Sequence, residues 1–302
     1  MCSEQMEGAM HGNPRAVDGL AFAFMWSSAF ASARIIVLAA PPLMSLSLRF
    51  LISGLIGIAI ARALGQNWNL TRAQWRAILV FGLSQNALYL GLNFVAIQTV
   101  EASLAAIIAS SMPLLVAFAG WAFAGERLRP LAIFGLAAGF GGVAIIMGAR
   151  MGSGVDLYGV ALCVAGAIAL TVATLSVRGA SAGGGNLLMI VGLQMLVGSA
   201  ILAGPALAFE TFTVTWSWQL AAAFSYTVLV PGLAATWVWF LLVGRIGAVR
   251  AATFHFLNPF FGVAVAAVLL GESLGIYDVI GVAIIMAGIL AVQRSRVVAK
   301  LG

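Results

Sequence analysis

The chain has 302 residues, of which 63% are hydrophobic and 8% are charged. Soluble proteins average about 45–50% apolar and about 25% charged residues, so this composition excludes a soluble domain and indicates an integral membrane protein. In a soluble protein, a net charge of +6 would suggest a nucleic-acid partner. Here the arginines fall in short breaks between apolar runs, where they act as topology signals, and we expect no nucleic-acid partner.

Ten apolar runs are long enough to cross a bilayer, for which about 20 residues suffice. They predict an all-α polytopic membrane protein with ten transmembrane helices near 17–38, 43–64, 75–98, 102–124, 130–149, 156–177, 186–209, 218–243, 249–270 and 276–293. Residues 1–16 form a polar tail without the features of a signal peptide. Residues 297–302 form a second tail, so we expect the membrane bundle to be the whole fold.

Two arginines lie inside the first two predicted helices. Arg49 lies about 9 Å along the second helix. It could bind a carboxylate, but an arginine at that depth can also reach the headgroups, so we expect a structural role. Arg34, near the outer end of the first helix, has the same expectation.

Polar residues inside a bilayer are costly and usually face the interior of the bundle. In the third predicted helix, Gln85, Tyr89 and Asn93 recur every four residues and share one face, with Asn86 beside them. An amide, a phenol and an amide could line the path of a polar solute. Alternatively, these side chains hydrogen-bond to neighbouring helices and stabilise their packing.

The fourth and ninth predicted helices contain Pro113 and Pro259. Proline removes an amide donor and frees carbonyl groups, so both prolines are predicted hinges, although a packed kink without a ligand is the alternative. The polar residues that precede them are candidate substrate ligands: Ser110, Ser111, Thr253, His255 and Asn258. His255 either relays a proton in a coupled exporter or bonds to a neighbouring helix.

Aromatic side chains at depth could stack on the apolar part of a solute. Trp26 in the first helix and Trp237 in the eighth lie deepest and are the predicted lining residues. Trp239 lies two residues further on, so we expect it on roughly the opposite side of the helix.

The second half of the chain repeats the first. A shift of 146 positions aligns Pro113 with Pro259 and Gly125-Glu126 with Gly271-Glu272. Each copy, 17–150 and 151–296, holds five helices, an odd number, so the second copy enters the membrane from the opposite side. We therefore predict two inverted repeats around a central cavity.

Basic residues predict the orientation of this bundle. With a cytoplasmic N-terminus, the outside loops hold Arg150 alone, which places both tails in the cytoplasm. The inside segments then hold Arg15, Arg62, Arg72, Arg76, Arg127, Arg129, Arg178, Arg245, Arg250, Arg294, Arg296 and Lys300.

These features carry a family resemblance over about residues 19–293. The two five-helix copies, the paired prolines, the two Gly-Glu pairs and the segments Phe24-Met25-Trp26-Ser27-Ser28 and Arg49-Phe50 resemble the EamA-type branch of the drug/metabolite transporter superfamily. Within that branch, the chain is similar to the inner-membrane exporters of aromatic and other neutral amino acids, called YddG-type. The resemblance implies a secondary transporter that works by alternating access.

A neutral or zwitterionic solute, such as an amino acid or a related small metabolite, fits the candidate residues best, since no acidic residue is expected at the midplane. No carboxylate or metal-ligand cluster is visible, so we expect neither an enzyme nor a cofactor or metal. A lipid or lipid-linked sugar flippase and a non-transporting membrane scaffold are the alternatives. Small-residue stripes indicate close packing within one chain, with membrane lipid around it and no dimer required.

Overall fold

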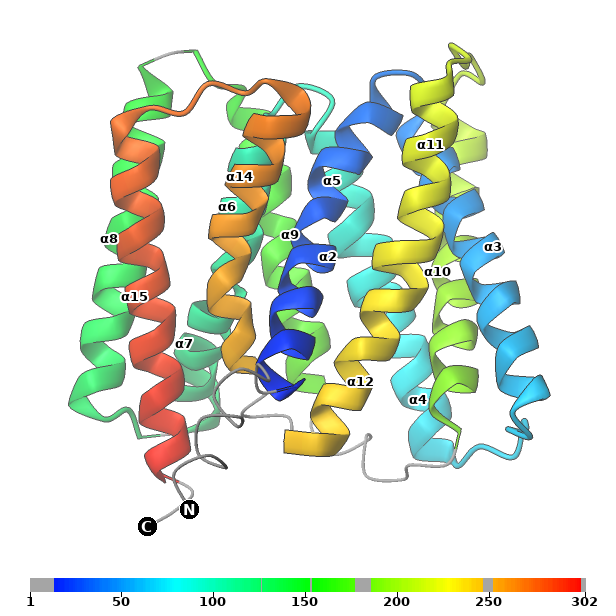
Figure 1. Ribbon diagram of the computed structural model, residues 1–302, viewed down its shortest axis with the longest axis horizontal. Coiled ribbons are helices and arrows are strands. Elements are labelled where there is room, and N and C mark those ends of the chain that lie inside the picture. Colours follow the sequence, from blue (N-terminus) through cyan, green and yellow to red (C-terminus); the bar gives the residue numbers. More distant parts are fainter. Residues whose placement is uncertain (1–13, 126, 153, 177–185, 247–251, 300–302) are drawn as a thin grey trace, which may run out of the picture.

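The computed structural model describes residues 14–125, 127–152, 154–176, 186–246 and 252–299. Within these ranges, nine helices are long and apolar enough to cross a membrane, and a shorter apolar helix, Phe254–Leu270, is the tenth. The regular elements of the described residues are all helical (Figure 1). The prediction of an all-α polytopic membrane protein is therefore confirmed.

Six spans are single helices: α2 (Pro14–Val37), α3 (Pro42–Ala63), α8 (Pro130–Met151), α9 (Leu157–Ser176), α10 (Leu187–Phe209) and α15 (Ile276–Ala299). Four are built from pieces: α4 (Arg72–Phe81), η1 (Gly82–Tyr89) and α5 (Leu90–Ala96); α6 (Ala102–Ser110) and α7 (Met112–Ala124); α11 (Trp218–Thr227), η3 (Val228–Ala234) and α12 (Ala235–Ile246); η4 (Ala252–Leu257) and α14 (Asn258–Leu270).

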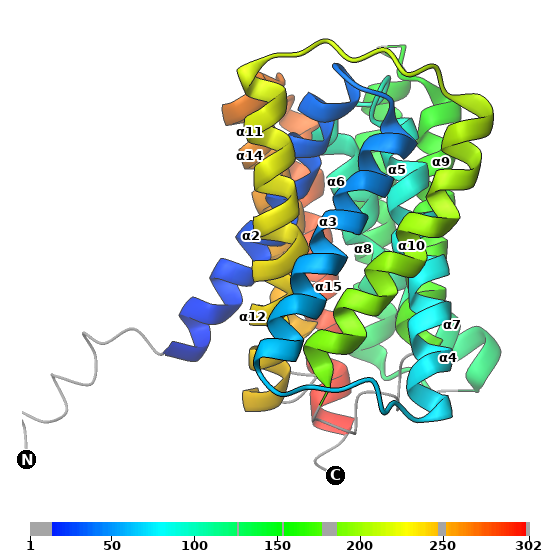
Figure 2. The ribbon, with the colours of Figure 1, turned by 90° about the vertical axis from the view of Figure 1, so that its right-hand side faces the viewer.

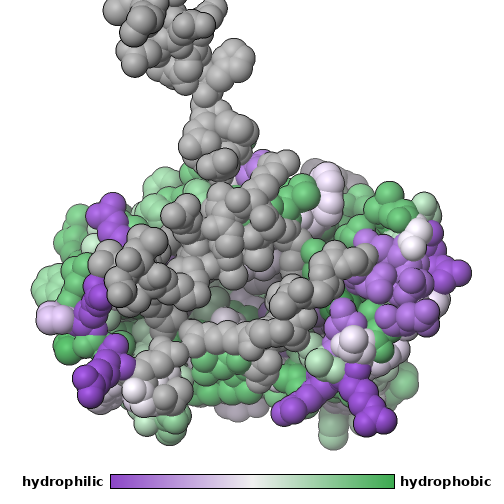
Figure 3. Space-filling view, turned by 90° about the horizontal axis from the view of Figure 1, so that it is seen from below, coloured by the Kyte–Doolittle hydropathy of each residue, from purple (hydrophilic) through white to green (hydrophobic). Residues whose placement is uncertain are grey.

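The helices run side by side between two ends of the molecule (Figure 1). We call the end where α2 begins and α15 ends the proximal end, and the end where α2 ends and α15 begins the distal end. The segment that joins α10 to α11 crosses the distal end, and the segment that joins α3 to α4 crosses the proximal end (Figure 2). Hydrophilic side chains lie around the rim of the proximal end (Figure 3), where Arg62, Arg72, Arg127 and Arg129 are exposed.

The duplicated glycines end equivalent helices. Gly125 has φ 66° at the end of α7, and Gly271 has φ 68° at the end of α14. Residues with a Cβ atom rarely adopt this left-handed backbone conformation, so glycine is the usual residue at such a helix end. Glu126, which follows the first glycine, lies outside the described residues.

Two spans contain π-helical segments, which the sequence analysis did not anticipate. One is η1, and the other is η3, which contains Pro231. Because Pro231 has no amide hydrogen, the carbonyl of Thr227 cannot receive the usual helical hydrogen bond from it. The wider π turn accommodates this loss and turns the residues that follow to a different face.

Two antiparallel helix pairs pack closely through small residues. On α8 and α15, a Cβ atom at Gly135 would lie 2.7 Å from the carbonyl oxygen of Gly288, and one at Gly142 would lie 2.8 Å from that of Gly281. On α3 and α10, Ser47 and Ser199 each donate a hydrogen bond to the other's carbonyl, at 2.9 and 2.8 Å. These contacts bring two helix backbones together as small residues do in membranes.

Candidate functional site

A narrow pocket lies where α2, α6, α7, α9, η4 and α14 meet. It is lined by Trp26, Ser27, Phe30, Ala109, Ser110, Met112, Pro113, Leu170, His255 and Asn258. Both broken helices contribute to it, since the chain passes from α6 to α7 at Ser111 and from η4 to α14 at Leu257. The breaks follow from the prolines, each of which lies in the first turn of the helix after the break, where no amide donor is needed.

Equivalent positions of the two copies lie on the same pocket. The shift of 146 residues pairs Ala109 with His255 and Met112 with Asn258, and all four line the pocket. The first copy thus contributes a methyl group and a thioether, whereas the second contributes an imidazole and an amide. At these two matched positions the first-copy side is apolar and the second-copy side is polar, while Ser110 adds a hydroxyl group from the first copy.

The polar side is built around Asn258. Its side-chain amide lies 2.9 Å from Nδ1 of His255, and its main-chain carbonyl accepts a hydrogen bond from Ser27 at 3.2 Å. With the amide nitrogen as donor, Nδ1 of the imidazole is the acceptor and the ring proton lies on Nε2. Oδ1 of Asn258 is buried and has no hydrogen-bond partner among the described residues. Asn258 therefore carries an unsatisfied acceptor beside the pocket.

Aromatic rings surround the imidazole of His255. The ring centroids of Phe22 and Trp239 each lie 5.2 Å from it, and that of Trp26 lies 6.2 Å away. The expectation for the tryptophans of α12 needs correction, because Trp237 is 53% exposed on the outer surface while Trp239 packs against the pocket residue. Depth along the helix therefore does not decide which of the two tryptophans faces inward.

The structure does not place the candidates of the third span at the pocket. Asn86 donates to the carbonyl of Gln194 at 2.9 Å and so joins η1 to α10. Asn93 donates to the carbonyl of Tyr89 in its own span at 2.8 Å, and Tyr89 is fully buried. Gln85 is half-buried. The packing alternative describes the hydrogen bond of Asn86, which joins two helices.

Two further candidates, Ser111 and Pro259, are not among the lining residues. Ser111 is buried and donates to the carbonyl of Ile108 at 2.6 Å, within its own helix turn. Pro259 is buried in the first turn of α14. The side chain of Thr253 lies outside the described residues.

Sequence analysis missed five of the lining residues: Ser27, Phe30, Ala109, Met112 and Leu170. Two of them carried a usable signal, because Ala109 and Met112 occupy the positions that match His255 and Asn258 in the other copy. The other three are small or apolar residues in apolar helices, and no residue pattern separates them from lipid-facing positions.

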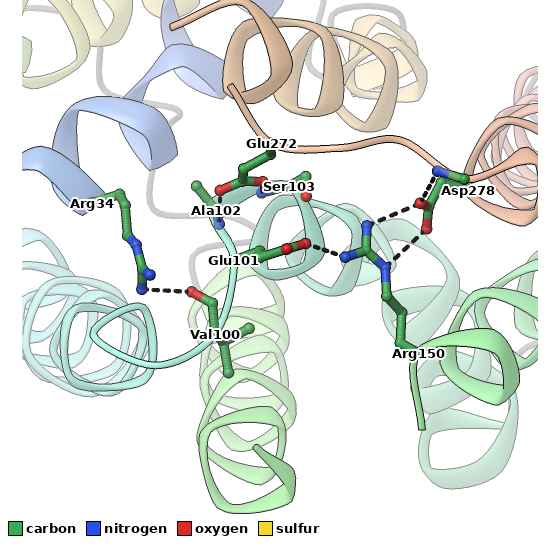
Figure 4. A network of polar contacts seen from close by, with 9 residues as sticks. Arg34, Val100, Glu101, Ala102, Ser103, Arg150, Glu272 and Asp278 are labelled. Atoms are coloured by element: carbon green, nitrogen blue, oxygen red, sulfur yellow. Dashed lines mark hydrogen bonds and ion pairs between the residues drawn. The ribbon is translucent and has the colours of Figure 1, made fainter. Parts of the chain in front are cut away.

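Polar contacts within and between the two copies lie at the distal end (Figure 4). Arg150 at the end of α8 forms ion pairs with Glu101 and, at 2.9 Å, with Asp278 of α15. The carboxylate of Glu272 accepts hydrogen bonds from the amides of Ala102 and Ser103 at 2.8 and 3.0 Å, which caps α6. An anionic cap at a helix N-terminus is favourable because of the free amides and the helix dipole.

Other distal contacts tie the loops to the helices. Arg34 donates to the carbonyls of Ile97 and, at 3.1 Å, Val100. Thr99 donates to Asp156 at 2.6 Å, and this hydrogen bond lowers the pKa of the Asp156 carboxyl below its usual range. Glu210 accepts from the amides of Leu43 and Met44 at the start of α3, at 2.7 and 2.8 Å.

The pocket carries no carboxylate, and no group of three His, Cys, Asp or Glu residues in the described ranges could hold a metal ion. The lining combines aromatic rings, an amide whose oxygen is unsatisfied and an imidazole.

Comparisons with known proteins identify the family. The model of the EamA-like transporter family matches this chain twice, over residues 17–148 and 157–293. The chain is 27% identical to "Uncharacterized transporter YvbV" of Bacillus subtilis (strain 168), over 93% of this chain and 92% of that protein. It is 28% identical to "Uncharacterized inner membrane transporter YedA" of Escherichia coli (strain K12), over 83% and 79%.

Two further comparisons are more limited. The "Aromatic amino acid exporter YddG" of Ancylobacter novellus is 32% identical over 114 residues, which cover 38% of this chain and 39% of that protein. A solved structure described as "Crystal structure of protein" superposes with a TM-score of 0.67 at 22% identity and covers 95% of this chain and 98% of that chain, which shows the shared fold. The two family matches cover most of the chain, so this integral membrane protein belongs to the EamA-like transporter family of the drug/metabolite transporter superfamily.

Proposed function

We propose that this transporter exports amino acids, aromatic and other neutral ones, across a bacterial inner membrane by alternating access. One observation carries the proposal: the breaks of the two equivalent helices meet at a single pocket, where Ala109 and Met112 face the pocket with their counterparts His255 and Asn258. A substrate site at the junction of two repeats is the arrangement that lets one transporter open to either side.

The contacts of α8 with α15 support inverted repeats, 17–150 and 151–296. Under the shift of 146 residues, Gly135 corresponds to Gly281 and Gly142 corresponds to Gly288. The observed contacts are crossed, since Gly135 meets Gly288 and Gly142 meets Gly281. Exchange of the two copies by a two-fold axis converts each contact into the other, as at an isologous interface.

The composition of the pocket favours a neutral or zwitterionic solute. Trp26 and Phe30 offer aromatic surface, and Oδ1 of Asn258 offers an acceptor for an ammonium group. A buried carboxylate, which a lipophilic cation would favour, is not among the lining residues. The partial similarity to an aromatic amino acid exporter points to the same class of substrate.

We assign the proximal end to the cytoplasm. Among the described residues, Arg62, Arg72, Arg76, Arg127 and Arg129 belong to segments that meet that end, whereas Arg150 lies at the distal end. On this assignment, the ion pairs of Arg150 and the cap formed by Glu272 hold the external end closed, and transport requires them to part. Pro113 and Pro259 act as hinges in that exchange.

The test is uptake of labelled phenylalanine into proteoliposomes that contain the purified protein. We expect saturable counterflow that aromatic and neutral aliphatic amino acids inhibit and that arginine and lysine do not. A pH gradient separates proton antiport through His255 from facilitated export or exchange, since only antiport is driven by it. Absence of phenylalanine counterflow at any pH contradicts the proposal.

A further inference from the structure

Arg49 lies inside the bundle, and no acidic residue of the described ranges forms an ion pair with it. It lies on α3 about 10 Å from the start of the helix and is 4% exposed. The sequence analysis considered that this side chain could reach the headgroups. Because it is buried, it does not. No carboxylate of the described residues forms an ion pair with it, since both ion pairs in these ranges belong to Arg150.

One of its nitrogen atoms has a structural task. Nε donates to the main-chain carbonyl of Thr227 at 3.2 Å. That carbonyl lacks its usual helical partner because the residue four positions later is Pro231. Ser53 donates to the next carbonyl, that of Val228, at 3.1 Å. Arg49 and Ser53 thus add hydrogen bonds to the backbone where α11 passes into η3.

The two terminal amino groups of Arg49 have no hydrogen-bond partner among the described residues. The guanidinium carbon lies 5.2 Å from the ring centroid of Phe50, and the neighbouring ionisable group is the phenol of buried Tyr89. Neither group neutralises a cation. Arginine keeps its proton, so the unpaired charge must be balanced from outside the chain or remain costly.

Arg34 shows what a structural arginine looks like in the same protein. Its guanidinium donates to the carbonyls of Ile97 and Val100 at the end of the third span. Free carbonyls at a helix C-terminus attract a cation, so Arg34 needs no further partner. Arg49 donates to one carbonyl only, through Nε. Its two terminal amino groups have the spacing that binds a carboxylate with two parallel hydrogen bonds.

We propose that Arg49 binds an anion, with the bidentate geometry of a carboxylate, at a site apart from the pocket of His255. Ser32 of α2, which accepts a hydrogen bond from Thr227 at 2.9 Å, and Tyr89 of η1 bring polar groups to the same region. The anion is the carboxylate of a substrate or a small inorganic anion. The substrate identification alone rests on the proposed export function.

Thermal melting of the purified full-length protein tests this site. The probes are 3-phenylpropionate, which has a carboxylate and no amine, phenethylamine, which has an amine and no carboxylate, and chloride, each in a buffer whose main anion is a bulky sulfonate. We expect 3-phenylpropionate at ten times its dissociation constant to raise the melting temperature of the wild type by about 3 °C. Phenethylamine should leave it unchanged.

Matched variants locate the effect. Arg49→Met should lose the shift in melting temperature on addition of 3-phenylpropionate. Without ligand, this variant should melt no lower than Arg34→Met, because it removes a charge without an ion-pair partner, whereas Arg34→Met removes a guanidinium with two hydrogen-bonded carbonyls. Arg34→Met should keep the shift. Arg49→Lys keeps the charge without the fork and should bind 3-phenylpropionate about tenfold more weakly, which covers the case in which Arg49→Met does not fold.

The outcomes separate the sources of the anion. A shift with 3-phenylpropionate alone identifies a carboxylate, and an equal shift with chloride identifies an inorganic anion. The site is refuted if neither anion shifts the wild type, if the shift survives Arg49→Met and Arg49→Lys, or if phenethylamine acts equally. Loss of phenylalanine counterflow with an Arg49-dependent shift intact would refute the export function and leave this site standing.

Discussion

In the first copy, the chain breaks between α6 and α7 beside Ala109 and Met112, whereas in the second copy it breaks between η4 and α14 beside His255 and Asn258. The backbone features are the same in both copies: a proline lies in the first turn of α7 and of α14, and a glycine in the left-handed conformation ends each helix. The side chains differ in polarity at both pocket positions. Both copies thus place a broken helix at the pocket, and at the two matched positions only the second copy carries an imidazole and an amide.

The largest effect should follow from removal of the open acceptor. Asn258→Ala takes away Oδ1, the buried oxygen without a partner, and should raise the half-saturation concentration for phenylalanine at least about tenfold, since a hydrogen bond to a charged group contributes about 1.5–3 kcal/mol. Met112→Ala, at the matching position of the other copy, should change it far less. Equal effects of the two substitutions in counterflow assays would mean that the two sides do not differ in function.

The glycine contacts between α8 and α15 should be the next most sensitive feature, and substitutions there should lower the stability of the protein. A Cβ atom at Gly288 would lie 2.6 Å from the carbonyl oxygen of Gly135, so Gly288→Ala should destabilise the protein by about 1–3 kcal/mol. Gly142→Ala should cost a similar amount, because the crossed contact is equivalent. Gly141→Ala meets nothing within 4 Å and should be neutral or slightly stabilising. Melting temperatures that rank these variants otherwise would contradict the two-fold relation.

The distal cap should affect access to the pocket more than stability. Glu272→Gln weakens the anionic cap on Ala102 and Ser103 by about 1 kcal/mol, which should favour the state open at the distal end about fivefold. The measurement is the labelling rate of Ser103→Cys by a membrane-impermeant thiol reagent, in a background with Cys2 and Cys163 replaced by serine.

Glu210→Gln is the matched control for this experiment. Glu210 caps Leu43 and Met44 with the same geometry, but α3 is held to α10 along its length by small-residue packing. Its substitution should leave the labelling rate unchanged. A similar increase in both variants would indicate general loosening of the distal end.

The smallest effect is expected from the hinges. Pro113→Ala and Pro259→Ala each restore an amide donor and allow a continuous helix. Each should slow phenylalanine counterflow several-fold while the shift in melting temperature on binding stays unchanged. If the substitutions leave the counterflow rate unaltered, the prolines are packed kinks and not hinges.

The π-helical segments illustrate why individual candidates failed. The prediction that Gln85, Tyr89 and Asn93 face a cavity assumed regular helix periodicity through η1, and the choice of Trp237 over Trp239 relied on depth alone. A π turn changes which residues share a face, and the sequence does not mark where one forms. The candidates that did reach the pocket, such as Ser110, His255 and Asn258, lie near prolines. At these places the residue type itself predicts the break in the helix.

The amino-acid sequence by itself determined the spans, the duplication, the paired breaks and the glycine ends of α7 and α14, because apolar length, proline and left-handed glycine act locally. Only the tertiary structure decided which side chains meet at the pocket and that Arg49 is buried with no ion-pair partner in the described part of the chain. The physical reason is that lipid-facing and core-facing positions of a membrane helix are both apolar. The sequence therefore carries little record of which way a residue faces, and helix packing supplies it.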